Sequence, residues 1–427
     1  MEVRLSRWKE RLIILLLCLF LGLGSTSLVL YLPIPDLIGI ITLLLGGTLT
    51  FFVVTECPSA RYPLIVAFAL RAALALVHYY IVPLPDSQAD ALTFERLAAE
   101  WSEHGLTGIW YQFRTGAYLY SWLIAVVYSL VGRSPLTAQA INVLFGSLIV
   151  RNVYFVAKQL WDDSVATRAA WVAAVFPTLA LYSSITMREV AIVFPLTLGV
   201  LYFLRWLHRG RYTDMIKALV ACGISVAFHT GMVAALLVMA LGAFFQWLRA
   251  FPTGRIGLVL KRGFALGIVA VGIGAILVSG WGLEKIGGLK VSNLVDWVAN
   301  QQLRAARSRA AYLQHLQPRN AFDLILQVPI RITYFLFMPF PWLVRTWADL
   351  LGLIISICNL LLTTLILCSF PRILVDCKRR WVFYVLFALL VTFALTTSNY
   401  GTSIRHSSKL VPLALMLIRA PRVRLWS

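Results

Sequence analysis

The sequence predicts an all-α protein, a polytopic bundle of transmembrane helices that forms one integral membrane domain over residues 1–427. Composition is the first reason: 60% of the 427 residues are hydrophobic and 13% are charged, whereas an ordinary globular domain carries about 25% charged residues. The second reason is that apolar runs of roughly 20 residues recur from end to end, each long enough to cross a ~30 Å hydrocarbon core as a helix. A soluble protein is excluded, and we expect about 10–13 membrane segments with short amphipathic helices in the outer loops.

The chain is strongly basic, with 38 Lys and Arg against 18 Asp and Glu and a formal net charge of +20. In a membrane protein, basic residues collect in cytoplasmic loops and near anionic head groups, so we expect membrane lipid and no nucleic acid as a partner. The six cysteines show no paired spacing that would indicate a disulfide framework or a zinc site. Neither a Walker A loop nor a dinucleotide fingerprint is present. No cofactor is therefore certain, and a divalent metal stays open.

The N-terminal part of the chain places an acidic loop outside the membrane. A first segment, Arg11 to Leu32, follows a basic stretch and is expected to be a retained anchor that starts in the cytoplasm. Spans at about 36–55 and 62–83 follow, so the third crossing leaves residues 84–115, the acidic outer loop, on the outer side. We expect one or two short amphipathic helices here, with a break at Gly105. The loop holds five acids: Asp86, Asp90, Glu95, Glu100 and Glu103.

The remaining apolar runs do not alternate cleanly across the membrane. They lie near 116–132, 136–157, 165–186, 188–204, 216–245, 264–281, 326–341, 348–370, 381–397 and 409–419. Three basic patches should all be cytoplasmic: Arg205 to Arg211, Arg249 to Arg262 and Arg372 to Arg380. This requires that one of the four runs between residues 116 and 204 fails to span, and the sequence does not say which one.

Two later runs are expected to be interrupted. The run 216–245 has basic flanks at both ends and fits two half-spans that meet at an outer turn around His229. The run 326–341 contains three prolines and fits a re-entrant or surface-lying element. With these choices, the loops 282–325 (the basic outer loop) and 396–408 face the same outer side as the acidic outer loop.

Asp86 and Asp90 are the first candidates for chemistry. They stand at i and i+4 beyond the third span and would share a face if the stretch were helical. A carboxylate at a membrane boundary can have a raised pKa and serve as a general base or hold a cation. The alternative is that Asp86 is a helix N-cap and that Asp90 is merely solvated. If one of the pair is catalytic, the capping argument leaves Asp90 as the freer candidate.

A second group of candidates is basic and lies in the basic outer loop: Lys285, Lys290, Arg304, Arg307, Arg309 and Arg319. Six cations on the outer side go against the positive-inside tendency, which indicates a local counter-charge. A phosphate or pyrophosphate fits, because arginine forks bind it bidentately. The alternative is a surface helix, Ser292 to Leu316, that extends its arginines toward lipid phosphates.

The polar segment from Ser398 to His406 supplies a third group. Gly401 permits close backbone approach, and Arg405 with His406 offers a fixed cation plus a titratable one; the alternative is a plain polar turn. Arg71, Arg151 and Arg331 lie within apolar runs, where a charged residue is costly and either functions or bridges helices. On charge alone, Arg188 and Glu189 favour a local ion pair at a helix start.

These motifs together resemble the GT-C superfamily of membrane glycosyltransferases. Asp90, Phe94 and Ala98 fall at a spacing similar to the aspartate, aromatic and alanine of the family's first outer loop. The segment Tyr182 to Glu189, with its Arg-Glu pair, is similar to a core-span motif of bacterial members. The segment Asn399 to His406, with Pro412, looks like a late motif of bacterial polysaccharide enzymes.

The resemblance implies a GT-C-like fold and a polyprenyl-phosphate-linked sugar donor. A carboxylate of the first outer loop acts as base in that family, which implies Asp90 as the base and Asp86 as its helper. The implied substrate-binding residues are Arg188, Glu189, Arg304, Arg307, Arg405 and His406. Independently of the family, such a reaction needs acids and arginines at one membrane boundary, since a proton leaves the acceptor while negative charge grows on the departing phosphate.

The expected function is therefore transfer of a sugar from a polyprenyl-phosphate-linked donor to a glycan or lipid acceptor. The expected location is the plasma (inner) membrane, with the active site on its outer side. Envelope polysaccharide or glycolipid assembly is the expected role, because the sequence shows no large soluble C-terminal domain. Two alternatives stay open: an O-antigen-type polysaccharide polymerase, and a lipid or glycan transporter.

Overall fold

The computed structural model describes residues 33–250, 291–305 and 309–419, and within these ranges it is helical and contains no β-strand. The predicted all-α class is confirmed. The first helices are α3 (Ile34–Thr55), α4 (Arg61–Tyr80), α5 (Asp90–Ser102), α6 (Gly105–Ile109), α7 (Ala117–Val131), α8 (Pro135–Leu160), α9 (Asp163–Val175), α10 (Pro177–Tyr182) and α11 (Glu189–Arg209). There follow α12 (Tyr212–Phe228), α13 (Val233–Ala250), α16 (Val291–Ala305), α17 (Ala321–Phe337), α18 (Trp347–Val375), α19 (Cys377–Thr396), α20 (Tyr400–Ser408) and α21 (Val411–Leu417).

Six of the described helices are long and apolar enough to cross a membrane by length and composition: α3, α4 with the turn before it, α8, α11, α18 and α19. The chain is accordingly an integral membrane protein. The expected anchor from Arg11 to Leu32 and the apolar run 264–281 lie outside the described residues.

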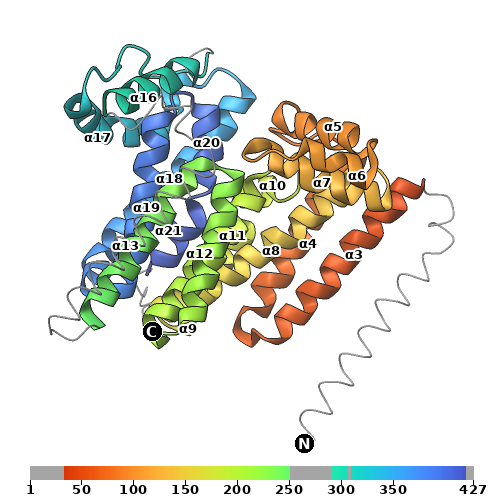
Figure 1. Ribbon diagram of the computed structural model, residues 1–427, viewed down its shortest axis with the longest axis horizontal. Coiled ribbons are helices and arrows are strands. Elements are labelled where there is room, and N and C mark those ends of the chain that lie inside the picture. The colour runs from red at the N-terminus through yellow and green to blue at the C-terminus, as the bar shows by residue number, and fades with distance from the viewer. Residues whose placement is uncertain (1–32, 251–290, 306–308, 420–427) are drawn as a thin grey trace, which may run out of the picture.

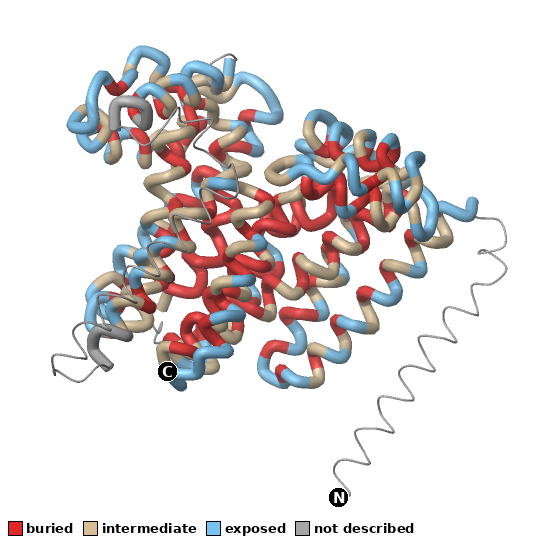
Figure 2. Tube along the Cα trace, viewed as in Figure 1, coloured by how far each residue is buried: buried red, intermediate tan, exposed pale blue. Residues whose placement is uncertain are grey.

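Helix α8 lies at the centre of the bundle, where it packs against α3, α4, α9, α11 and α21. Figure 2 shows this central region as an almost continuous buried zone. Several polar side chains inside it are hydrogen-bonded, as burial favours. The side-chain amide of Asn142 donates to the hydroxyl of Tyr120 at 2.8 Å and to the carbonyl oxygens of Ile185 and Met187 at 2.7 and 3.0 Å. These bonds fix the segment between α10 and α11 against α8.

The apolar run 165–186 is divided into two short helices, which identifies it as a run that does not span as one helix. Phe176 adopts an extended backbone before Pro177, as the residue before a proline tends to do, so α9 ends there and α10 begins. The buried side chain of Arg71 donates to the carbonyl oxygens of Ala173 and Ala174 at 3.2 and 2.7 Å. Arg71 thus bridges α4 to the end of α9, where helix carbonyls lack partners.

The expected interruption of the run 216–245 is present, and it separates α12 from α13. They meet at His229 and a short 3₁₀ turn, Thr230–Met232, where the backbone amide of Gly231 donates to Nδ1 of His229 at 3.1 Å. In the later interrupted run, α17 contains Pro329 and ends at Phe337, before Pro339.

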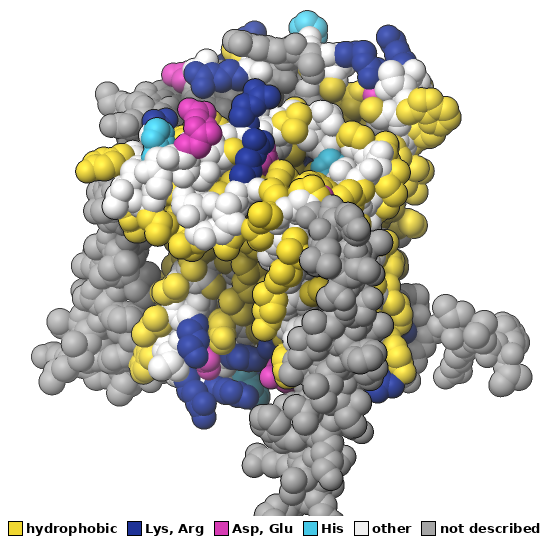
Figure 3. Space-filling model, turned by 90° about the vertical axis from the view of Figure 1, so that its right-hand side faces the viewer, with side chains coloured by type: hydrophobic (Ala, Val, Ile, Leu, Met, Phe, Trp, Pro, Cys, Tyr) yellow, Lys and Arg dark blue, Asp and Glu magenta, His cyan; other side chains and the backbone are white. Residues whose placement is uncertain are grey.

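The polar loops lie at one end of the bundle, and the basic turns lie at the other. In Figure 1, α20 and α10 lie between the group α5–α7 and the pair α16 and α17, and we call this the site end. The turns between α11 and α12 and between α18 and α19 lie at the opposite end, where Nζ of Lys378 is 3.3 Å from Nδ1 of His208. Figure 3 shows charged side chains toward both ends with an apolar belt between them.

Candidate functional site

Asp86 lies in a turn rather than on a helix, so the condition under which it would share a helical face with Asp90 is not met. Its φ is 59°, a left-handed value that a helix does not contain. Pro83 and Pro85 precede it, and α5 begins only at Asp90, with Ala89 in the N-cap position. The alternative role of Asp86 as N-cap is therefore also wrong. Its carboxylate instead accepts a hydrogen bond from the hydroxyl of Tyr182 at 2.7 Å.

Asp90 is the first residue of α5 and pairs with Arg405 across the site end. Nη1 of Arg405 donates to Oδ2 of Asp90 at 2.5 Å. The segment that carries Arg405 is a nine-residue helix, α20, and not a plain polar turn. Asn399 caps this helix, because its side-chain oxygen accepts from the backbone amides of Gly401 and Thr402. The structure thus joins the first and third candidate groups.

Glu189 is the first residue of α11, and its side chain is 2% exposed. Its ion-pair partners come from α20 and the C-cap residue of that helix rather than from the adjacent Arg188. Oε1 lies 3.2 Å from Nε of Arg405 and 3.4 Å from Nζ of Lys409, the C-cap. The side chain of Arg188 donates instead to the carbonyl oxygen of Phe228 at 3.3 Å and lies over the ring of Phe94. The local ion pair expected from the sequence is replaced by a long-range one.

Arg405 of α20 and Lys409, the C-cap residue of that helix, have pKa values shifted in opposite directions. Burial lowers the pKa of Arg405, but the carboxylates of Glu189 and Asp90 outweigh it and the net shift is upward. Burial lowers the pKa of the Lys409 amine to about 7, and Glu189 opposes this only in part. With Arg188 and Asp86 included, three carboxylates and three basic side chains meet in this cluster.

His406 lies in a buried aromatic environment next to the cluster. Its ring centroid is 5.3 Å from that of His229 and 4.8 Å from that of Phe393, and its Nδ1 is 3.2 Å from Oγ1 of Thr397. Burial, followed by the charge of Lys409, holds the pKa of His406 well below its ordinary value. This direction opposes the expectation that His406 supplies a titratable cation near pH 7.

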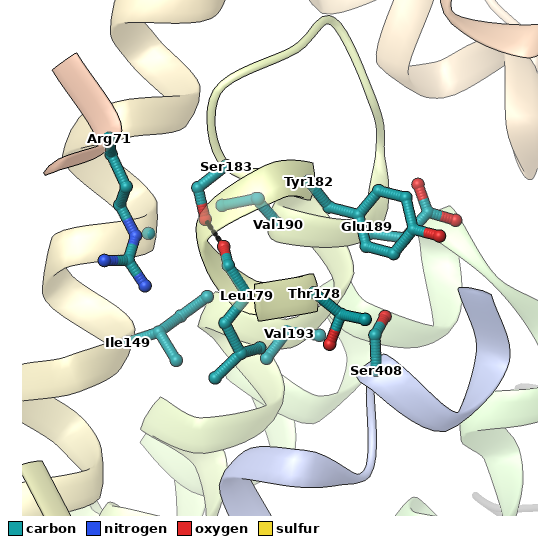
Figure 4. Close-up of a pocket in the computed structure, with 11 residues that line it drawn as sticks. Arg71, Ile149, Thr178, Leu179, Tyr182, Ser183, Glu189, Val190, Val193 and Ser408 are labelled. Atoms are coloured by element: carbon teal, nitrogen blue, oxygen red, sulfur yellow. Dashed lines mark hydrogen bonds between the residues drawn. The ribbon is translucent and has the colours of Figure 1, made fainter. Parts of the chain in front are cut away.

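A cavity of about 10 Å³ is lined by residues that include Glu189, Tyr182 and Arg71. This volume is about the room of one water molecule. Figure 4 shows Tyr182, Glu189 and Ser408 on one side of it and Arg71 on the other. The cavity is too small for a sugar, so a substrate at this cluster would have to approach from the exposed side of Asp90.

The basic outer loop contributes less to this cluster than the sequence suggested. Arg304 is exposed on α16, and no contact described for it reaches Asp90 or Glu189. Arg307, Lys285 and Lys290 lie outside the described residues. Arg309 is bound by Asp349 through two hydrogen bonds of 2.8 and 2.9 Å, which uses its fork on a carboxylate.

Sequence reasoning missed Lys409 and the role of Tyr182. Lys409 was counted as the start of the apolar run 409–419, although it follows Arg405 at i+4 and a helix through both would have placed them on one face. Tyr182 was part of a motif but had no assigned partner.

Regarding metals, the ranges 33–250, 291–305 and 309–419 contain no group of three or more His, Cys, Asp or Glu side chains placed to hold an ion.

Comparison with known proteins agrees with the resemblance stated from the motifs. Residues 116–281 match the family described as Dolichyl-phosphate-mannose-protein mannosyltransferase. This confirms the predicted resemblance to GT-C enzymes and the predicted enzyme class, a glycosyltransferase, and it supports a polyprenyl-phosphate-linked sugar as donor. The matched segment contains Arg188 and Glu189 but neither Asp90 nor Arg405. The searches of curated proteins and of solved structures gave no match.

Proposed function

We propose that this protein transfers a sugar from a polyprenyl-phosphate-linked donor to a hydroxyl of a glycan or lipid acceptor, with Asp90 as the base. The observation that carries the proposal is the 2.5 Å contact between Asp90 and Arg405. An acid of the first polar loop and an arginine near the C-terminal end of the described chain meet at one end of a membrane bundle. Transfer from a lipid phosphate requires this combination, since a proton and a phosphate charge must be handled at the same boundary.

In the reaction, the acceptor oxygen forms a bond to the anomeric carbon while the bond from that carbon to the donor phosphate breaks. The acceptor proton passes to the carboxylate of Asp90. The electron pair of the broken bond remains on the phosphate, whose added negative charge is stabilised by the guanidinium of Arg405. The side chain of Asp90 is 47% exposed, so an acceptor hydroxyl can reach it.

Other residues of the cluster support these two. Asp86, hydrogen-bonded to Tyr182, adds negative charge beside the base and acts as its helper. Arg188, at the start of α11 over the ring of Phe94, supplies a second cation for the donor phosphate. The imidazole of His406, the residue after Arg405, packs against the rings of His229 and Phe393. Helix α16, which carries the exposed Arg304, lies at the same end of the bundle (Figure 1), so we assign Arg304 to the lipid-phosphate surface around the site.

We place the site on the outer side of the plasma membrane, in envelope polysaccharide or glycolipid assembly. The basic turns Arg205 to Arg211 and Arg372 to Arg380 support this orientation, because they lie at the opposite end of the bundle and basic turns favour the cytoplasm.

A product assay tests the proposal. Full-length protein in vesicles is given defined polyprenyl-phosphate sugars and acceptors, and new glycosidic bonds are measured. We expect product with the wild type and with Glu100→Gln, a matched change on the exposed face of α5, and a loss with Asp90→Asn. Product formation at the wild-type rate by Asp90→Asn would favour the polymerase alternative, in which arginines act without a carboxylate base. Movement of the lipid-linked sugar without any new bond would favour the transporter.

A further inference from the structure

Arg405 has two carboxylate partners that differ sharply in their surroundings. Glu189, 3.2 Å from Nε, has a side chain that is 2% exposed, whereas Asp90, 2.5 Å from Nη1, has one that is 47% exposed. The guanidinium itself is 19% exposed and lies between them. One partner is therefore enclosed in the bundle, and the other faces the side from which a substrate approaches.

Lys409 holds Glu189, the enclosed partner of Arg405, in place. Its side chain is 0% exposed, and its Nζ lies 3.4 Å from the same Oε1 of Glu189 that Arg405 contacts. The amine also lies over the ring of Phe393, 5.7 Å from its centroid. Separating Glu189 from these two cations would leave charges buried without partners, which is strongly unfavourable. Arg405 consequently cannot leave Glu189 without a large cost.

The pair with Asp90 has no such constraint. An ion pair with an exposed carboxylate is weak, because water can replace either partner. A phosphate offers the same guanidinium fork several oxygens and can bind it bidentately. A donor phosphate entering from the exposed side would therefore compete with Asp90 for Arg405 and not with Glu189.

The pairing with Arg405 also obstructs the role of Asp90 as a base. The guanidinium donates to Oδ2 of Asp90 at 2.5 Å and so occupies one of the oxygens that would accept a proton. That oxygen becomes free for the acceptor hydroxyl once the guanidinium moves to another anion. This argument rests on the proposed function, in which Asp90 takes the acceptor proton.

We propose that Arg405 exchanges Asp90 for the donor phosphate while it keeps Glu189, which Lys409 positions, so that donor binding releases the base. Lys409 and Glu189 are positioning residues in this scheme. The donor binds first, and the acceptor is then activated. After transfer, the phosphate leaves with its added charge, the proton that Asp90 took up passes to water on the exposed side of that residue, and Arg405 returns to the carboxylate. No charge is gained or lost by the protein over the cycle.

Binding of a probe that cannot react tests the exchange. The probe is a polyprenyl monophosphate without a sugar, and its Kd is measured with full-length protein in lipid nanodiscs. Asp90→Asn removes the competing carboxylate, so the probe should bind about fivefold more tightly, the factor expected from losing one exposed ion pair. Glu100→Gln should leave the Kd unchanged, and Arg405→Ala should weaken binding at least tenfold.

Equal or weaker binding of the probe by Asp90→Asn, with Glu100→Gln unchanged, would overturn the exchange. This outcome is distinct from failure of the proposed function. If Asp90→Asn loses transfer but does not bind the probe more tightly, Asp90 remains the base and the exchange alone is wrong. If Asp90→Asn retains transfer, the base assignment is wrong whatever the Kd.

Discussion

Replacement of Lys409 by methionine should remove a pH dependence of donor binding. Burial holds the pKa of Lys409 at about 7, so its amine is about 90% protonated at pH 6 and about 10% protonated at pH 8. Only the protonated amine pairs with Glu189 and holds it for Arg405. The wild type should therefore bind a polyprenyl phosphate more tightly than Lys409→Met at pH 6, and the two should converge as the pH rises through about 7.

The magnitude follows from the geometry around Glu189. Removing one partner of a buried ion pair costs about 3–5 kcal/mol, but Arg405 remains 3.2 Å from the same oxygen. We therefore expect less than half of that cost, about 1.4 kcal/mol, or a tenfold difference in Kd at pH 6. The other charged or titratable side chains that face Lys409 are Arg188, Arg405, His229 and His406. Burial holds the pKa of both histidines well below its ordinary value, and the arginines stay charged.

The assay is probe binding from pH 5.5 to 8.5, expressed as the ratio of the two Kd values at each pH. The ratio is needed because the probe phosphate itself titrates near pH 6. Lys158→Met is the matched control, since Lys158 pairs with Asp163 and not with the carboxylates of the site. A ratio that stays constant over the whole range would refute the reasoning.

The remaining predictions concern the other partners in the site and its sidedness. Arg405→Lys should lower the turnover number by on the order of 10²-fold under donor saturation, because an ammonium cannot present a fork to Glu189 and phosphate at once; unchanged turnover would remove Arg405 from the chemical step. Asp86→Asn should cost less activity than Asp90→Asn, because an amide oxygen still accepts the hydrogen bond from Tyr182; an equal loss would contradict a helper role. Cysteines introduced into the acidic outer loop should be labelled from outside intact cells and those at 372–380 should not, and the reverse pattern would invert the orientation.

Much of the fold could be predicted because local chemistry determines it. Prolines and a glycine mark the interruptions: α6 begins at Gly105, whose φ is +66°, and α10 begins at Pro177. The turn at His229 follows from the basic residues at both ends of the run 216–245, which favour the same side of the membrane for both ends. The polar residues at the centre of the run mark where the chain turns. The meeting of Asp90 with Arg405 at one end of the bundle also follows from charge, since acids and arginines were expected at one boundary.

The details of the site could not be predicted because they depend on packing between distant segments. Asp86 looks like a helix cap in sequence, but its left-handed backbone and its bond to Tyr182 are set by α10, far along the chain. Glu189 has an adjacent arginine, and only the approach of α20 shows that its partners are elsewhere. Similarly, the lowered pKa of His406 comes from its burial against His229, which follows α12, and Phe393 of α19, and the polar sequence around it does not reveal these contacts.

One measurement on Asp90→Asn tests the central claim most directly: the Kd for a polyprenyl-phosphate-linked sugar and the single-turnover rate of glycosidic bond formation, determined on the same sample. The account predicts that the donor binds about fivefold more tightly while the rate falls by about 10²–10⁴-fold, the range for loss of a general base. A rate equal to that of the wild type with donor bound would contradict the account, because Asp90 would then neither take the proton nor need to be released by Arg405.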